Sequence, residues 1–268
     1  MTVFTMAHKN KLKKTAVKAG VILIWLLLWQ LSAVLIGSEF LFPSPVSVLE
    51  RLFELACTAQ FWRSAAFSLG RISLGCAAGI IFGTLLGTAT AFSKTLYEFL
   101  SPLLVTVKTT PVASFIILLL VWIKRSGIPV VIAFLMVVPI MWANVAQAIA
   151  GTDKNLLEAA KIFRFSRYKT FKAVYLPAVL PAFAAGCSTA IGFSWKAGIA
   201  AEVLAIPPNS VGYNLYYAKI NLEYADLFAW TAAVILMSFL LERAAVHLLA
   251  RLSKAPRSGS GGKNADNS

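Results

Sequence analysis

Histidine, cysteine and acidic residues are scarce in this chain, which has 2 His, 3 Cys and 11 Asp and Glu among 268 residues. The two histidines, His8 and His247, stand far apart, and no His, Cys, Asp or Glu residues cluster with the spacing of metal ligands. The odd number of cysteines (Cys57, Cys76 and Cys187) and their apolar surroundings argue against a disulfide framework. We therefore expect no metal, no catalytic residues and no bound cofactor in this chain.

Polar sequence is scarce too, because 59% of the residues are hydrophobic and only 13% are charged. Soluble domains average roughly 45–50% apolar residues. The net charge of +14 is a feature of nucleic-acid-binding proteins, but here Lys and Arg are spread over short loops and termini. The composition instead predicts an all-α integral membrane protein, embedded in a lipid bilayer, with about six transmembrane helices and no nucleic-acid partner.

The apolar runs define the expected order of the chain. A basic N-terminal segment (1–19) precedes a transmembrane domain (20–252), and a disordered tail (253–268) follows it. A signal peptide is the alternative for the N-terminus, but no convincing cleavage site follows the first apolar run. The six expected spans are Gly20–Gly37, Ser68–Phe92, residues 99–123, Ile128–Ala150, Val179–Ala201 and Leu227–Leu249. Basic residues concentrate in the loops on the side of both termini, which places the termini in the cytoplasm and the chain in a plasma or inner membrane.

Two segments carry helical packing signals. Gly75, Gly79, Gly83 and Gly87 are spaced by four, so they share one helix face and permit close approach of a neighbouring helix. We expect packing within the chain, with a dimer seam as the alternative. The Ser44–Pro45 pair starts a short amphipathic helix on the outer surface, or alternatively an ordinary packing helix. We expect its apolar face to contain Val46, Leu49, Phe53 and Ala56.

The longest polar interruption, residues 151–177, is strongly basic and has signals for two short helices. Asn155 is the expected N-cap of the first helix, with Glu158 three residues later, and Ser166 is the expected N-cap of the second. Pro177 is expected near the end of the second helix, and a turn near Arg164 joins the two. From charge alone, a solvated connector and a docking surface are both open.

The order Glu158-Ala159-Ala160, a turn, and then Phe-x-x-Val-x-Leu176-Pro177 resembles the cytoplasmic loop of ABC importer permeases. That resemblance implies the importer-permease (MetI-like) architecture, in which this loop forms a coupling helix that docks on an ATPase. The chain has Arg164 where the family usually has Gly, and a left-handed residue with a Cβ atom costs roughly 1 kcal/mol. The coupling residues that the resemblance implies are Glu158, Ala159, Ala160, Arg164, Ser166, Leu176 and Pro177.

Further segments resemble the nitrate, taurine and aliphatic sulfonate branch of these permeases. They are Phe42–Pro45, Lys108–Pro111, Trp195, Ala201–Glu202 and Ser210–Tyr213. The branch implies two permease copies forming a homodimer, ATPase subunits that hold ATP and Mg²⁺, and an extracytoplasmic solute-binding protein. It implies no catalytic activity in the permease, which also lacks a nucleotide-binding loop.

The expected translocation path contains five residues: Lys108, Pro111, Trp195, Lys196 and Glu202. Lysines facing a path favour an anionic solute, with Glu202 as a counter-charge, whereas snorkelling to the interface is the alternative for Lys108. A thiamine pyrimidine precursor or another heterocycle is the alternative cargo. A secondary transporter is the rival class, but its intramembrane acids or histidines and its internal repeat are not evident.

Overall fold

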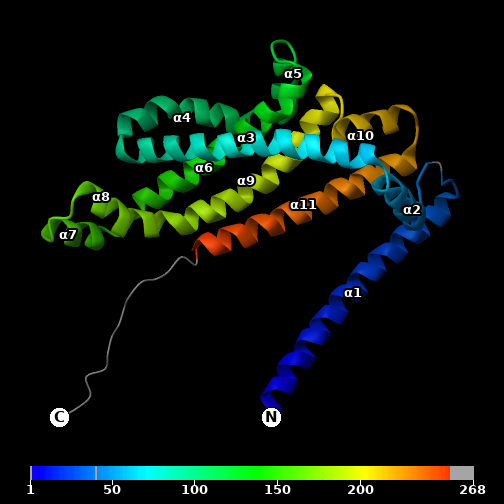
Figure 1. Cartoon of the computed structure of the whole chain (residues 1–268), viewed down its shortest axis with the longest axis horizontal. Coiled ribbons are helices and arrows are strands. Elements are labelled where there is room, and N and C mark those ends of the chain that lie inside the picture. Colours follow the sequence, from blue (N-terminus) through cyan, green and yellow to red (C-terminus); the bar gives the residue numbers. More distant parts are fainter. Residues whose placement is uncertain (1, 40, 254–268) are drawn as a thin grey trace. The chain divides into compact units, whose positions relative to one another are not determined.

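The computed structural model describes residues 2–39 and 41–253 of the chain (Figure 1). This part of the chain is helical. Its helices, in order, are α1 (Thr2–Ile36), α2 (Pro45–Ala56), α3 (Ala59–Phe92), α4 (Lys94–Thr109), α5 (Val112–Leu119), η1 (Arg125–Gly127), α6 (Ile128–Ala150), α7 (Lys154–Ile162), α8 (Arg167–Thr170), η2 (Phe171–Tyr175), α9 (Leu176–Ala205), α10 (Val211–Ile220) and α11 (Tyr224–Ser253).

The prediction of an all-helical membrane protein is confirmed, but the count of spans is lower than six. In the described residues 4 helices are long and apolar enough to cross a membrane, or 5 if the bent pair of α4 and α5 counts as one span. The first expected span corresponds to the shorter apolar segment Gly20–Ile36 within α1, which also includes most of the basic segment before it. The expected tail lies outside the described residues, except for Ser253 at the end of α11.

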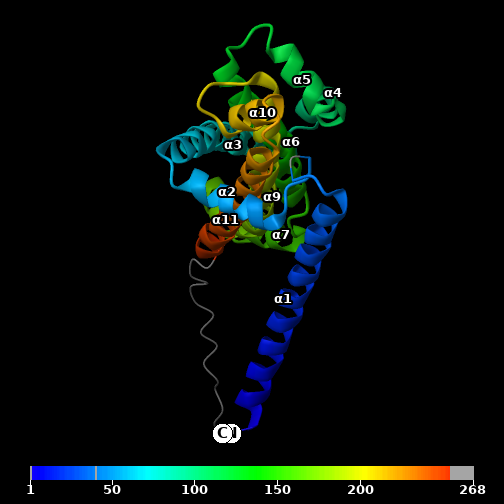
Figure 2. The same cartoon turned by 90° about the vertical axis from the view of Figure 1, so that its right-hand side faces the viewer.

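Proline explains why the third expected span is broken. Thr110 is extended (ψ 129°) ahead of Pro111, as a residue before proline usually is, and α5 begins directly after Pro111. The two helices are bent by 99°, and Figure 2 shows them meeting at this sharp angle. The helix also starts earlier than the expected span at residues 99–123, because Ser93 caps α4 and the helix begins at Lys94.

Helix boundaries agree best where the signal is local. The fourth span was predicted at Ile128–Ala150, and α6 has these bounds. By contrast α3 begins at Ala59 and not near Ser68, and the helix α10, which lies between the fifth and sixth expected spans, was not predicted. The helices α8, η2 and α9 form one continuous helical stretch, Arg167–Ala205, so Pro177 does not end the second loop helix. Pro177 is the second residue of α9 and lies directly after the π-helical turn Phe171–Tyr175, where the regular α-helical hydrogen-bond pattern is already interrupted.

The helices divide into two compact units, which we describe separately. The first contains the residues up to Arg63 together with Asn214–Val234. In it, Ser44 caps α2 as predicted, and the Arg51 guanidinium binds the carboxylates of Asp226 and Glu54. The hydrogen bonds to Asp226 and then to Glu54 raise the pKa of Arg51 above its ordinary value, which favours the charged guanidinium.

Helix α2 is amphipathic as predicted, and the part of the chain that the structure describes does not cover its apolar face. Val46, Leu49 and Phe53 are 58%, 62% and 73% exposed. An ordinary packing helix would bury this face against its own chain. The exposure favours the first interpretation, a helix that lies on the membrane surface with its apolar side in lipid.

The second unit contains Ser64–Tyr213 and the described residues from Ile235 onward. Its centre is the pair of α6 and α9, which Figure 1 shows side by side. Val137, Met141 and Val145 of α6 pack with Cys187 and Ala190 of α9 in one apolar cluster. The two central spans therefore cover each other, and their contact in this cluster is apolar.

Helix α3 packs on α6 through its glycines. A Cβ atom on Gly75 would lie 2.1 Å from the Val130 carbonyl oxygen, and one on Gly87 would lie 2.8 Å from the Trp142 carbonyl oxygen. Gly79 and Gly83 meet Val137 and Val138 at similarly short distances. The structure thus places all four glycines at a seam between two helices of the same chain.

Candidate functional site

The first helix of the basic loop, α7, is capped two residues earlier than expected. The Asp153 carboxylate accepts a hydrogen bond of 2.9 Å from the Asn155 backbone N–H, so Asp153 and not Asn155 is the N-cap. Both residue types are good caps, and the choice depends on where the backbone leaves α6. Ser166 caps α8 as predicted, because its hydroxyl accepts from the Lys169 N–H.

Helix α7 ends in a Schellman motif centred on Arg164. The Phe165 N–H donates to the Ala160 carbonyl (2.9 Å), and the Arg164 N–H donates to the Lys161 carbonyl (3.0 Å). Arg164 has φ of +49°, the left-handed conformation that glycine usually supplies at this position. The turn expected near Arg164 is therefore present, and the arginine adopts the glycine-type backbone itself.

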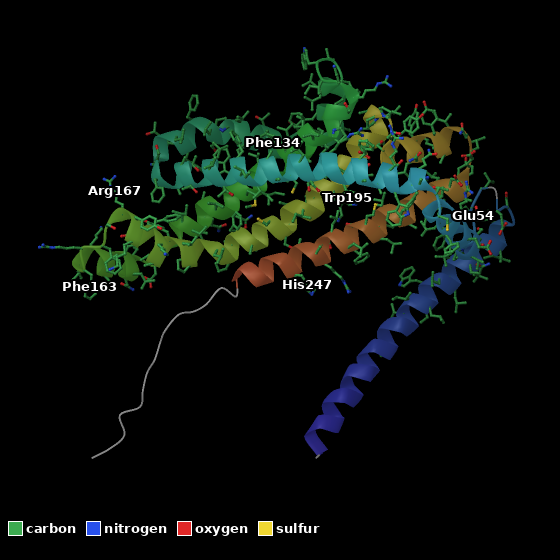
Figure 3. All side chains as sticks on the ribbon, viewed as in Figure 1. Glu54, Phe134, Phe163, Arg167, Trp195 and His247 are labelled. Atoms are coloured by element: carbon green, nitrogen blue, oxygen red, sulfur yellow. The ribbon has the colours of Figure 1, made fainter. Side chains whose placement is uncertain are left out.

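The loop presents its side chains outward, where a partner can reach them. Ile162, Phe163 and Tyr168 are 78%, 73% and 74% exposed, which is unusual for large apolar side chains outside a membrane span. Figure 3 shows Phe163 and Arg167 on this loop. Glu158, Arg164 and Ser166 are exposed, whereas Ala159 is half-buried and Ala160 is buried. The loop therefore has a small-residue inner side and an outer surface of apolar and basic groups.

The loop joins α9 through a π-helical turn. The Leu176 N–H donates to the Phe171 carbonyl, five residues back, and the turn comprises Phe171–Tyr175. Single π turns inside α-helices often occur at functional sites. Leu176 and Pro177, both exposed, follow this turn directly and connect the loop to the span.

The residues expected along a translocation path differ sharply in burial. Lys108 and Pro111 lie exposed at the break between α4 and α5, and Lys196 is exposed on α9. Trp195 is 1% exposed and is buried inside the second unit, where Figure 3 labels it. No ion pair joins Lys108 or Lys196 to Glu202 among the residues that the structure describes.

Glu202 is fully buried, and its charge partner is Arg71 of α3. Its Oε2 atom accepts hydrogen bonds from the Ser68 hydroxyl (2.6 Å) and the Gly212 N–H (3.2 Å). Its Oε1 atom lies 3.9 Å from Arg71 Nη1, and Arg71 Nη2 donates to the Pro208 carbonyl. The carboxylate therefore ties three segments together: α3, the end of α9 and the start of α10.

Close backbone approach is part of this arrangement. A Cβ atom on Gly212 would lie 2.3 Å from Glu202 Cβ, so only glycine fits where α10 begins. The Val211 N–H in turn donates to the Ser68 hydroxyl (2.9 Å). Sequence reasoning missed Ser68 and Arg71 because nothing local marks them as partners of a carboxylate so far along the chain. The one available signal was an arginine just inside an expected span, where a charge needs a partner.

The fold agrees with the comparison to known families. Residues 79–254 match the family described as the binding-protein-dependent transport system inner membrane component. The chain belongs to this family. It is therefore a multi-pass inner membrane protein, the non-catalytic permease subunit of a binding-protein-dependent ABC importer, and such an importer also has ATPase and binding-protein components. This membership decides against the secondary-transporter alternative.

Individual relatives cover most of the chain. A probable ABC transporter permease protein of Haemophilus influenzae is 30% identical over 87% of this chain and 93% of its own length. The taurine transport system permease protein of Escherichia coli K12 is 27% identical over 84% of this chain and 82% of its own. The putative aliphatic sulfonates transport permease protein of Bacillus subtilis is 27% identical, over 81% of this chain and 78% of its own.

A solved structure shares the fold. The crystal structure of a bacterial alginate ABC transporter, in complex with an alginate pentasaccharide-bound periplasmic protein, superposes with a TM-score of 0.58. The superposition covers 95% of this chain and 99% of that one, at 14% sequence identity. The likeness confirms the importer-permease fold for the described helices.

Proposed function

We propose that this permease carries a small anion of the taurine, sulfonate or nitrate type, and that its α7–α8 loop couples transport to an ATPase. The observation that carries the coupling role is the exposed, rigidly capped loop. Its first helix, α7, ends in the Schellman motif at Arg164, and its second helix, α8, continues without a break into α9. A helix that is continuous with a span transmits a displacement as a unit, because packed elements move together.

Each coupling residue has a role in this proposal. Exposed Glu158 contacts the ATPase, while Ala159 and Ala160 let α7 lie close to the rest of the loop. Arg164 and Ser166 set the turn between the helices. Leu176 and Pro177 pass the movement to α9. ATP and Mg²⁺ bind on the ATPase subunits, and the permease acts as a homodimer whose two copies enclose the path.

The substitution Glu158→Lys tests the coupling role. We expect it to reduce co-purification of the ATPase, or to leave ATP hydrolysis without solute uptake, while the permease itself folds normally. The matched control is Glu98→Lys, which reverses an exposed acid outside the loop. Wild-type uptake by the Glu158→Lys variant in proteoliposomes would contradict the proposal.

The anionic cargo is supported by uncompensated cations and by the names of relatives. Lys108 and Lys196 have no ion pair in the described chain, and the charge of Glu202 is compensated by Arg71, Ser68 and Gly212. Besides the taurine and sulfonate relatives, a nitrate import permease of Synechocystis is 24% identical over 88% of this chain. Exposed Pro111 shapes the break beside Lys108, and buried Trp195 and Glu202 support α9 behind Lys196.

Uptake by the double variant Lys108→Met, Lys196→Met tests the cargo. We expect a loss of transport of taurine, sulfonate or nitrate with ATPase assembly unchanged, because a cation on the path lowers the energy of an anion there. Unchanged uptake would reject the role of both lysines.

A second cargo class, a pyrimidine precursor, is supported by a formylaminopyrimidine transport relative that is 26% identical over 63% of the chain. Transport of such a heterocycle that is insensitive to the double variant would favour that class.

A further inference from the structure

Two neighbouring hollows in the second unit share a wall. The first, of about 240 Å³, lies among α3, α6 and α9, and its lining includes Thr84, Thr88, Val145, Ile149, Leu180 and Phe183. The second, of about 680 Å³, lies against the α7–α8 loop and is lined in part by Lys161 and Arg167. Phe92, Phe171 and Tyr175 line both hollows. The two spaces are therefore adjacent parts of one amphipathic cavity.

The first hollow is apolar in its chemistry. The Thr84 hydroxyl donates to the Ile80 carbonyl (2.6 Å), and the Thr88 hydroxyl donates to the Thr84 carbonyl (2.8 Å). Both threonines thus use their hydroxyl hydrogens on their own helix, which leaves neither hydrogen for a molecule in the hollow. Because the walls belong to three membrane spans, hydrocarbon is the chemistry that this hollow accommodates.

The second hollow is basic. Lys161 and Arg167 line it from the two sides of the Arg164 turn, and none of its lining residues is Asp or Glu. An anionic group placed there meets two cations and no acidic repulsion. The arginine fork also matches the geometry of a phosphate, which makes a phosphate ester a better match than a simple halide.

An aromatic wall separates the apolar part from the basic part. Phe92 at the end of α3 packs edge-on against Tyr175, with ring centroids 5.5 Å apart and planes at 80°. Tyr175 and Phe171 are the two ends of the π-helical turn. Aromatic side chains concentrate at the boundary between hydrocarbon and headgroups, so this wall indicates the depth at which a lipid glycerol would lie.

We propose that the two hollows together bind one anionic phospholipid. Its phosphate lies between Lys161 and Arg167, and one acyl chain enters the hollow among α3, α6 and α9. Basic pockets next to transmembrane helices on the cytoplasmic side are the usual sites for anionic headgroups. The proposal rests on the proposed function only for its orientation, which places the α7–α8 loop in the cytoplasm.

A lipid matches this cavity better than a protein partner. A soluble ATPase reaches the basic hollow but not the apolar one, whose walls are membrane spans. A single molecule with a negative head and a hydrocarbon tail fills both. The lipid would then hold the loop to the bilayer next to the Arg164 turn. Lipid composition would therefore affect how the loop binds the ATPase.

Native mass spectrometry of the detergent-purified full chain tests the site. The protein is titrated with dioleoyl phosphatidylglycerol and, separately, with dioleoyl phosphatidylcholine. We expect wild type to prefer the anionic lipid, and the double variant Lys161→Gln, Arg167→Gln to bind it roughly 25-fold more weakly, since each cation near an anionic headgroup contributes about five-fold. The control Lys154→Gln, Lys172→Gln removes the same charge from exposed positions that do not line the hollow and should keep the wild-type affinity.

The acyl-chain part has its own test. Thr88→Phe fills the apolar hollow and should weaken binding of both lipids, whereas Leu85→Phe, on the exposed side of the same helix, should not. If Thr88→Phe fails to fold, binding of dihexanoyl phosphatidylglycerol to wild type tests the same point. A short acyl chain cannot fill the hollow, so this lipid should bind more weakly than the dioleoyl lipid.

Several results would overturn the lipid site. These are no preference for the anionic lipid in wild type, equal losses in the two double variants, equal binding of short and long chains, or displacement of the lipid when the ATPase partner is added. Uptake in proteoliposomes separates this proposal from the transport function. ATP-driven uptake without selective lipid binding rejects the lipid site alone, and selective lipid binding without ATP-dependent uptake rejects the proposed function alone.

Discussion

The α3–α6 seam and the α7–α8 loop, both in the second unit, differ in how closely the rest of the chain packs against them. At the seam a Cβ atom on Gly75 would lie 2.1 Å from a carbonyl oxygen, so there is no room for any side chain but hydrogen. On the loop Phe163 is 73% exposed, and its neighbours are basic and uncovered by the described chain. The seam is covered within the chain, whereas the large apolar side chains of the loop are left exposed. The difference predicts that changes in the packed spans act on stability and changes in the loop act on coupling.

The largest effect should come from leaving a charge buried and unpaired beside the seam. Arg71→Met removes the cation next to Glu202, whose side chain is 0% exposed. We expect the free energy of unfolding to fall by about 3–5 kcal/mol, because the remaining carboxylate keeps its desolvation penalty without its partner. Thermal unfolding in detergent, followed by tryptophan fluorescence, measures this. The double variant Arg71→Met, Glu202→Gln should recover part of the loss, and no recovery would mean that the pair is not the cause.

Overpacking the seam should have a smaller effect. Gly75→Ala forces α3 away from α6, and we expect a loss of about 1–3 kcal/mol in the same unfolding experiment. Gly70→Ala is the control on the same helix, because its added Cβ atom meets nothing within 4 Å. Equal melting temperatures for the two variants would show that the glycine seam does not limit the approach of the helices.

The smallest effect should appear in the loop. Arg164→Gly relieves the left-handed backbone at φ +49° and should stabilise the end of α7 by about 1 kcal/mol. In this variant the backbone amides at positions 164 and 165 should exchange hydrogen roughly five-fold more slowly than in wild type, because about 1 kcal/mol corresponds to that ratio of rates. Arg164→Ala keeps a Cβ atom and should show no gain. Similar protection in both variants would mean that the strain is not at this residue.

Sequence reasoning succeeded where the signal was local. Ser44 and Ser166 were identified as caps, and α6 has the predicted bounds, because capping and hydropathy depend on residues a few positions apart. It failed at Asp153, where two good cap residues stand close together and the path of the backbone decides between them. It also missed α10, a short helix whose turn-like flanking residues masked its pattern.

The sequence by itself determined a helical membrane protein with a glycine-faced span and a basic loop, and its resemblance to a known family implied an importer permease. Composition and periodicity are properties of neighbouring residues, so they can be interpreted without a fold. Only the tertiary structure decided that Arg71 and Ser68 meet Glu202, and that a basic hollow at Lys161 and Arg167 adjoins an apolar one. These contacts join segments far apart in the chain, and their distances follow from helix packing, which no local pattern specifies.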